Sequence, residues 1–165
     1  MSLRIFITAY IEAGFISDEI NDGVKKQIEY LEELVTKLQL LHKNFSQWYI
    51  LAEGEGIPPL KTKFPSDLAA KKITQMKNEN PFTILTIWNG LIDKHVSITL
   101  FDLMIQIDVL DGKWLENINE YLAMTKAILE IFPTKYLFIK PENIFENQVF
   151  EHRYPCSSII FIPQK

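Results

Sequence analysis

The pattern of apolar positions changes period several times along the chain, and each change marks an expected element. Residues 3–11 are almost continuously apolar, which predicts a central strand covered on both faces. From Ser17 to about Lys43 the period becomes helical, with an apolar stripe at Val24, Ile28, Leu31, Val35 and Leu38. Further leucines at 34, 40 and 41 widen the stripe beyond a coiled-coil seam. We therefore expect this helix to pack on the chain's own sheet, and a monomer rather than a homodimer.

The middle of the chain predicts two more strands and a second helix. Residues 47–52 have strand character, and the Gly and Pro residues of 53–59 predict a loop. A helix is expected to begin at Ser66 and to end near Lys77. Residues 82–88 predict the next strand, and Asn89-Gly90 predicts that this strand enters a tight reversal.

The apolar alternation changes parity in the following segment. Apolar side chains occupy even positions from 96 to 100 and odd positions from 105 to 109, so a bulge or turn is required near residues 101–104. Residues 114–132 predict a third helix ended by Pro133, and 135–139 and 157–162 predict closing strands. This order predicts one α+β domain over residues 1–165, with a mostly antiparallel mixed sheet and about three helices packed on it.

Charge narrows the possible functions. The 165 residues include 47% hydrophobic and 23% charged side chains, as expected for a globular domain with its own core. The formal net charge of −4 argues against direct binding of DNA or RNA. Residues 93–120 contain six acidic residues and two lysines, so this segment accounts for the whole net charge of the chain. The acidic residues are Asp93, Asp102, Asp108, Asp111, Glu116 and Glu120.

Catalytic and metal-binding patterns are not found in the sequence. The three histidines are far apart and have no metal-type spacing. Asp102, Asp108 and Asp111 suggest a magnesium site, but the change of parity separates the first two, so solvent-facing carboxylates are favoured. The loop at 53–59 lacks a phosphate-binding glycine pattern, and it contains Glu53 and Glu55. We expect no metal, no cofactor and no catalytic residue.

The cysteine and the tryptophans each have two interpretations. Cys156 is the only cysteine, so an intrachain disulfide is impossible and a reducing compartment is indicated. A small buried side chain is favoured for Cys156 over a reactive nucleophile. Trp48, Trp88 and Trp114 are expected to anchor the core, and interface positions are the alternative. The apolar start of the chain is too short to span a membrane and lacks a cleavage site, so we expect a cytoplasmic protein.

Three short features occur in a recognisable order. A Trp-Tyr strand follows a long N-terminal helix, residues 87–90 read Ile-Trp-Asn-Gly, and the polar-apolar segment Ser-Ile-Thr-Leu follows at 97–100. A late helix with closing strands completes the pattern. Over most of its length the chain thus resembles the immunity protein 52 family of bacterial polymorphic-toxin systems.

The resemblance implies a partner. It implies an α+β protein that binds and neutralises a toxin of restriction-endonuclease-like fold encoded by a neighbouring gene, an inhibitor rather than an enzyme, with type VI secretion as the setting. Because a nuclease presents a cationic groove, carboxylates would speed a salt-sensitive association with it. The expected partner-binding residues are therefore the six acidic residues of 93–120, followed by Glu53 and Glu55.

A different class of function stays open. The chain could be a small-ligand-binding or catalytic α+β domain whose pocket is formed near residues 140–156 and includes Cys156. A toxin-like gene beside this one would favour inhibition, whereas a metabolic operon would favour the alternative.

Overall fold

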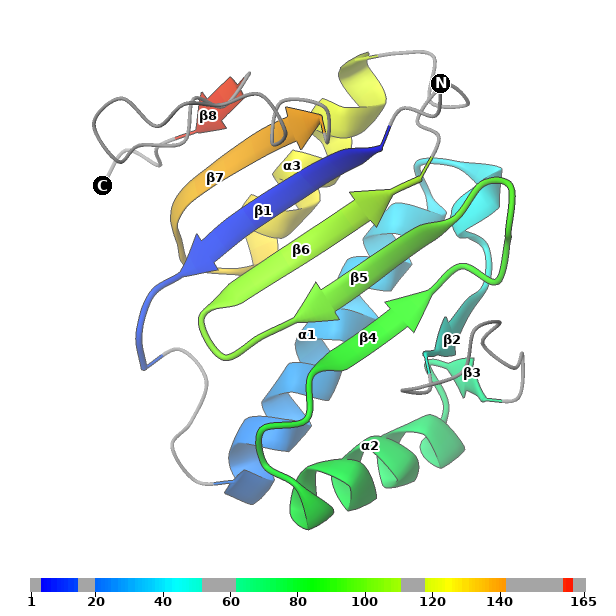
Figure 1. Ribbon diagram of the computed structural model, residues 1–165, viewed down its shortest axis with the longest axis vertical. Helices are drawn as coiled ribbons and strands as arrows, with labels where there is room; N and C mark the ends of the chain where they lie inside the picture. Colours follow the sequence, from blue (N-terminus) through cyan, green and yellow to red (C-terminus); the bar gives the residue numbers. More distant parts are fainter. Residues whose placement is uncertain (1–3, 15–19, 52–61, 111–117, 142–158, 162–165) are drawn as a thin grey trace.

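The computed structural model describes residues 4–14, 20–51, 62–110, 118–141 and 159–161 (Figure 1). The helices are α1 (Ile20–Gln39), the 3₁₀ helix η1 (Lys43–Phe45), α2 (Asp67–Glu79) and α3 (Ile118–Ile131). The strands are β1 (Ile5–Ile11), β2 (Trp48–Ile50), β3 (Lys63–Phe64), β4 (Leu85–Trp88), β5 (Val96–Leu100), β6 (Met104–Val109), β7 (Thr134–Pro141) and β8 (Ile159–Phe161).

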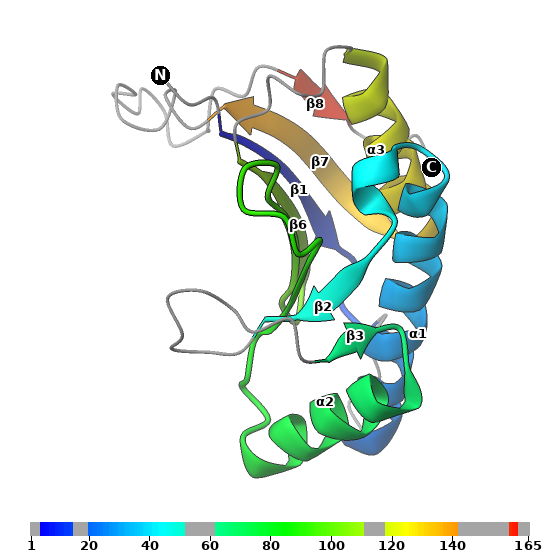
Figure 2. The ribbon, with the colours of Figure 1, turned by 90° about the vertical axis from the view of Figure 1, so that its right-hand side faces the viewer.

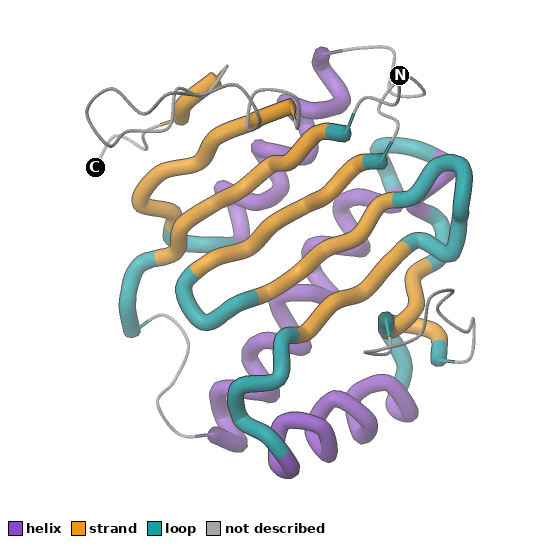
Figure 3. The backbone as a smooth tube through the Cα atoms, viewed as in Figure 1, coloured by secondary structure: helices purple, strands orange, loops and turns teal. Residues whose placement is uncertain are grey.

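These strands form one sheet against which the helices pack. The eight-stranded sheet has the order β3-β2-β4-β5-β6-β1-β7-β8, and each pair of neighbours is antiparallel. Figures 2 and 3 show α1, α2 and α3 on the same side of the sheet. The predicted α+β class, the antiparallel sheet and the three helices are confirmed.

The core lies between α1 and the sheet. The predicted stripe of α1 is buried, and Leu31, Val35 and Leu38 pack in one cluster with Ile7 of β1 and Ile107 of β6. The prediction that this stripe faces the chain's own sheet is therefore confirmed, because its apolar atoms are already removed from water inside the fold.

Strand β1 departs from the sequence prediction on one face. It lies inside the sheet between β6 and β7, but the described helices cover only the side of Ile7 and Ala9. Phe6, Thr8 and Tyr10 point to the other side, since side chains alternate along a strand. The prediction of a central strand is confirmed, and the predicted cover of its second face is found at Thr8, which is 4% exposed. It is incomplete at Phe6 and Tyr10, whose aromatic side chains are only half-buried.

The loop at residues 89–95 is longer than the expected tight reversal at Asn89-Gly90. Gly90 adopts a positive φ of 76°, whereas Asn89 acts through its side chain. The Asn89 amide donates hydrogen bonds to the carbonyl oxygens of Lys94 (2.7 Å) and Asn44 (3.2 Å), and its oxygen accepts one from the Val96 N–H (3.0 Å). The Asn-Gly pair therefore stabilises a wide loop and ties it to η1.

The turn between β5 and β6 agrees with the sequence. The Phe101 N–H donates to the Met104 carbonyl at 2.8 Å, and this closes the connection at residues 101–103. The parity change that required a bulge or turn near 101–104 is confirmed.

We predict that Asn89→Ala lowers the free energy of unfolding by about 2–3 kcal/mol, since it leaves buried backbone groups without partners. Asn89 is only 2% exposed. Urea denaturation measures the loss, and the control is Asn78→Ala at an exposed position of α2. The same denaturation midpoint for Asn89→Ala and the unmodified chain would show that these hydrogen bonds add nothing to stability.

Candidate functional site

The side of the sheet opposite α1, α2 and α3 is the candidate site, and we call it the open face. None of the described helices lies on it, and Figure 1 views the sheet from this side. Most backbone groups of β4, β5, β6, β1 and β7 pair within the sheet, so a partner meets this face mainly through side chains. The strand register sorts these side chains into three rows that cross the sheet.

The first row, here the buried row, is shielded from solvent. Its members are Tyr49, Trp88, Ser97, Asp108, Phe6 and Lys140, which are cross-strand neighbours, and all except Phe6 are buried. Arg4 forms an ion pair with Asp108. The Arg4 Nε atom donates to Asp108 Oδ1 at 2.9 Å, and its guanidinium carbon lies 4.9 Å from the Phe6 ring centroid. The Asp108 charge is thus balanced locally by a hydrogen-bonded cation.

Trp88 of the buried row lies beside His95, which belongs to the loop between β4 and β5. Their ring centroids are 5.5 Å apart. Burial lowers the pKa of His95, while Asp108 acts to raise it and Arg4 to lower it. The Trp88 Nε1 atom is buried and has no hydrogen-bond partner in the described structure.

The second row, here the hydroxyl row, crosses the middle of the open face. It consists of Thr86, Thr99, Gln106, Thr8 and Phe138 on five neighbouring strands. The hydroxyl oxygens of Thr86 and Thr99 are 3.1 Å apart and share a hydrogen bond. Thr8 is buried, so the row offers a partner the hydrogen-bonding groups of the half-buried Thr86, Thr99 and Gln106. None of its members is a nucleophile with an adjacent base.

The third row, here the apolar row, lies at the end of the open face beside the β5–β6 turn. Met104, Tyr10 and Tyr136 are cross-strand neighbours, and continuing the register by one residue adds Phe101 and Ile84. The Tyr10 and Tyr136 rings stack with centroids 4.6 Å apart. Ile84 is 45% exposed and Tyr136 is 42% exposed, so large apolar groups reach solvent here.

The structure does not gather the predicted acidic residues into one patch. Asp93 and Asp102 are exposed but lie beyond opposite ends of β5, whose five residues span about 17 Å. Asp108 is buried beside Arg4, and Glu120 lies in the first turn of α3 on the helical side. The remaining candidates fall outside the described residues, namely Asp111, Glu116, Glu53 and Glu55.

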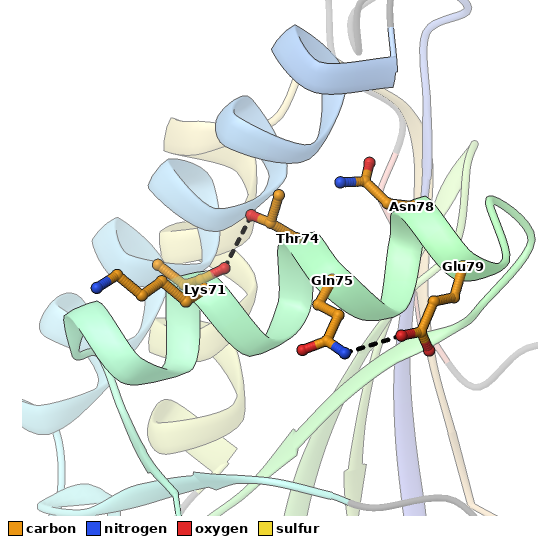
Figure 4. A pocket seen from close by; sticks show the side chains of 6 residues that line it. Lys71, Thr74, Gln75, Asn78 and Glu79 are labelled. Atoms are coloured by element: carbon orange, nitrogen blue, oxygen red, sulfur yellow. Dashed lines mark hydrogen bonds between the residues drawn. The ribbon is translucent and has the colours of Figure 1, made fainter.

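Other chemistry has little support in the described structure. No group of three or more His, Cys, Asp or Glu side chains there could hold a metal ion. A shallow depression of about 570 Å³ runs along α2 beside Lys71, Thr74, Gln75, Asn78 and Glu79 (Figure 4). Its side chains bond within the helix, as Gln75 does to Glu79 at 2.8 Å. The pocket predicted near residues 140–156, with Cys156, falls almost wholly outside the described residues.

Sequence reasoning missed the three rows. The single threonines of β4 and β5 and the phenylalanine and tyrosine of β1 were signs of strands, but their common face depends on the strand order. Trp48 is confirmed as a core anchor, since it is buried and its Nε1 donates to the Phe45 carbonyl at 2.9 Å. Trp88 is also buried, although on the open face, and Trp114 lies outside the described residues.

Comparison with known proteins gives only a distant similarity. No family model matches the chain, and no curated protein sequence does. The Pseudomonas aeruginosa T6SS protein PA0821 is similar in structure, with a TM-score of 0.46 and 7% sequence identity. The similarity covers 85% of this chain but only 41% of that protein. It does not assign the chain to a family. Among the described residues, no helix has the length and apolar character needed to cross a bilayer.

We predict that Trp88→Ala lowers the free energy of unfolding by about 3–5 kcal/mol, because Trp88 is 3% exposed and its loss leaves a large cavity. Trp88→Phe should cost less than about 2 kcal/mol, since it keeps most of the ring and removes the unpartnered donor. Chemical denaturation distinguishes the two variants. A loss well above about 2 kcal/mol for Trp88→Phe would mean that the indole nitrogen has a partner in solution.

A second prediction concerns acid stability. The pKa of His95 is lowered in the folded chain, so the unfolded chain takes up the proton first as pH falls below the ordinary value near 6.5. The stability contribution is therefore complete above that value and decreases on acidification toward the folded pKa. His95→Gln should show a smaller drop in melting temperature between pH 7.5 and 5.5 than the unmodified chain. His42→Gln is the control, and an unchanged drop in His95→Gln would refute the assignment.

Proposed function

We propose that this chain is an immunity protein that binds a cognate toxin and neutralises it, and that it is not an enzyme. The observation that carries the proposal is the open face, where stacked tyrosines, aliphatic groups and hydroxyl groups lie on a rigid sheet. Interfaces are enriched in tyrosine, phenylalanine and methionine surrounded by polar groups, and the hydroxyl and apolar rows together contain all of these. The resemblance to the immunity protein 52 family supports the toxin as partner.

The proposed toxin is a nuclease with a restriction-endonuclease-like fold. A nuclease attracts a polyanion, and an inhibitor with a net charge of −4 is attracted by the same field. Asp93 and Asp102 are exposed and are available to contribute to that attraction. Asp108 is a weaker candidate, because Arg4 already balances its charge.

The direct test is co-expression with the product of the neighbouring gene. The chain should co-purify with that protein in a fixed ratio and protect cells from it. It should have no effect on an unrelated nuclease. Normal growth inhibition by the neighbouring protein in the presence of this chain would overturn the proposal.

We predict that Asp93→Lys/Asp102→Lys slows association with that toxin by about tenfold at low salt and by less at high salt. Melting temperatures should hardly change, because exposed charges contribute little to stability. The matched control is Glu29→Lys/Glu33→Lys, which makes the same charge change on the exposed side of α1. Stopped-flow or biosensor kinetics at two ionic strengths give the rates, and equal slowing by both double variants would assign the effect to net charge alone.

A further inference from the structure

The end of the open face beside the β5–β6 turn combines several large exposed apolar groups. Ile84 and Tyr136 mark the two sides of the apolar row. Leu103, in the β5–β6 turn beside this row, is 51% exposed. Monomeric proteins expose single apolar residues commonly, but a contiguous group of them marks a binding surface.

The surroundings of this group are rigid. Tyr10 lies between Met104 and Tyr136 in the register, and its ring stacks on Tyr136 and lies 6.2 Å from Phe138. Aromatic side chains held in this way lose little freedom on binding and bury much area. At this end β5, β6 and β1 each pair on both sides, so a partner reaches the centre of the row through side chains.

The charges beside the apolar row indicate what kind of partner fits. Asp102 is exposed and lies between Phe101 and Leu103 in the turn. Glu12 is also exposed, and the N–H of the preceding Ile11 donates to the Leu103 carbonyl at 2.9 Å. Lys135 is an exposed cation at this end. Burial lowers the pKa of Lys77, while the nearby Asp102 carboxylate acts to raise it. The balance of these exposed groups is acidic.

We propose that the apolar row and the β5–β6 turn form the docking surface for a cationic protein partner. The partner contributes apolar or aromatic side chains to the row and places lysine or arginine against Asp102 and Glu12. This inference rests on the proposed function, since the neighbouring toxin is the partner it assigns to the surface.

A second copy of the chain fits this surface less well. A symmetric dimer through the apolar row would bring the same face of each copy together. Two copies of Asp102 and Glu12 would then meet with only two copies of Lys135, so the interface would carry four of these carboxylates and two of these lysines. Like charges brought together at an interface oppose association. A cationic partner turns the same carboxylates into ion pairs.

The test measures binding of the purified product of the neighbouring gene to variants of the full chain. Ile84→Ser/Tyr136→Ser should raise the dissociation constant roughly thirtyfold or more, as for the loss of two central apolar contacts. Asp102→Lys should slow association at low salt more than Asp93→Lys does, since Asp93 lies at the other end of the sheet. The control is Leu68→Ser on α2, where an apolar side chain 63% exposed is removed from the helical side.

The outcomes separate this inference from the proposed function. If the unmodified chain binds and the row variant and Asp102→Lys bind equally well and equally fast, the docking surface is refuted and the proposed function stands. If the unmodified chain does not bind, both are refuted.

Sedimentation of the chain alone gives a further check. A dimer that the row variant dissociates, with unchanged toxin binding, would assign the surface to self-association. Because Asp102 is exposed in a turn, its variant remains informative even if the double serine variant unfolds.

Discussion

Pairing of β1 with two strands from distant parts of the chain holds the fold together. Ile7 is the cross-strand neighbour of both Ile107 in β6 and Ile139 in β7. Strand β1 therefore joins the meander of β4, β5 and β6 to β7, and its buried side chains complete the core against α1. Without β1 the sheet would divide into two parts, each with an unpaired edge. The orientation of every side chain on the open face also depends on this register, because a shift by one residue would exchange the two faces.

The sequence predicted the elements of this fold better than their arrangement. The spacing of apolar residues located the three described helices, and the change of parity before Ile105 located the β5–β6 turn. Both patterns arise locally, because one side of a helix or strand is buried. The loop at Asn89 was misjudged, since a dipeptide cannot reveal that its side chain bonds to Asn44, which lies far away in sequence. Strand β3, with only two residues, has too short a pattern to be recognised.

The candidate site was predictable only in part, for a physical reason. A row across the sheet consists of residues contributed by different strands, so it exists only once strand order and register are known. The acidic residues of 93–120 formed a group along the chain, but strand length separates Asp93 from Asp102 in space, and folding pairs Asp108 with Arg4. Clustering along a chain of antiparallel strands therefore says little about clustering on a surface, since consecutive loops lie at opposite ends of the sheet.

The hydrogen bond from Asn89 to the Asn44 carbonyl has a consequence for how the fold opens. Among the described residues, β2 meets β4 at two pairs, Tyr49 with Trp88 and Ile50 with Ile87, and β3 at two more. The Leu51 N–H also donates to the Thr86 carbonyl at 3.0 Å. So short an edge would be expected to exchange its amide hydrogens by local opening, independently of the centre of the sheet. Asn89 adds a hydrogen bond between the segment before β2 and the loop that follows β4, so releasing the edge also costs this bond. The bonds of Asn89 to Lys94 and Val96 stay in place when the edge opens. Amides of β2 are therefore expected to exchange more slowly than the few pairs between β2 and β4 alone would allow.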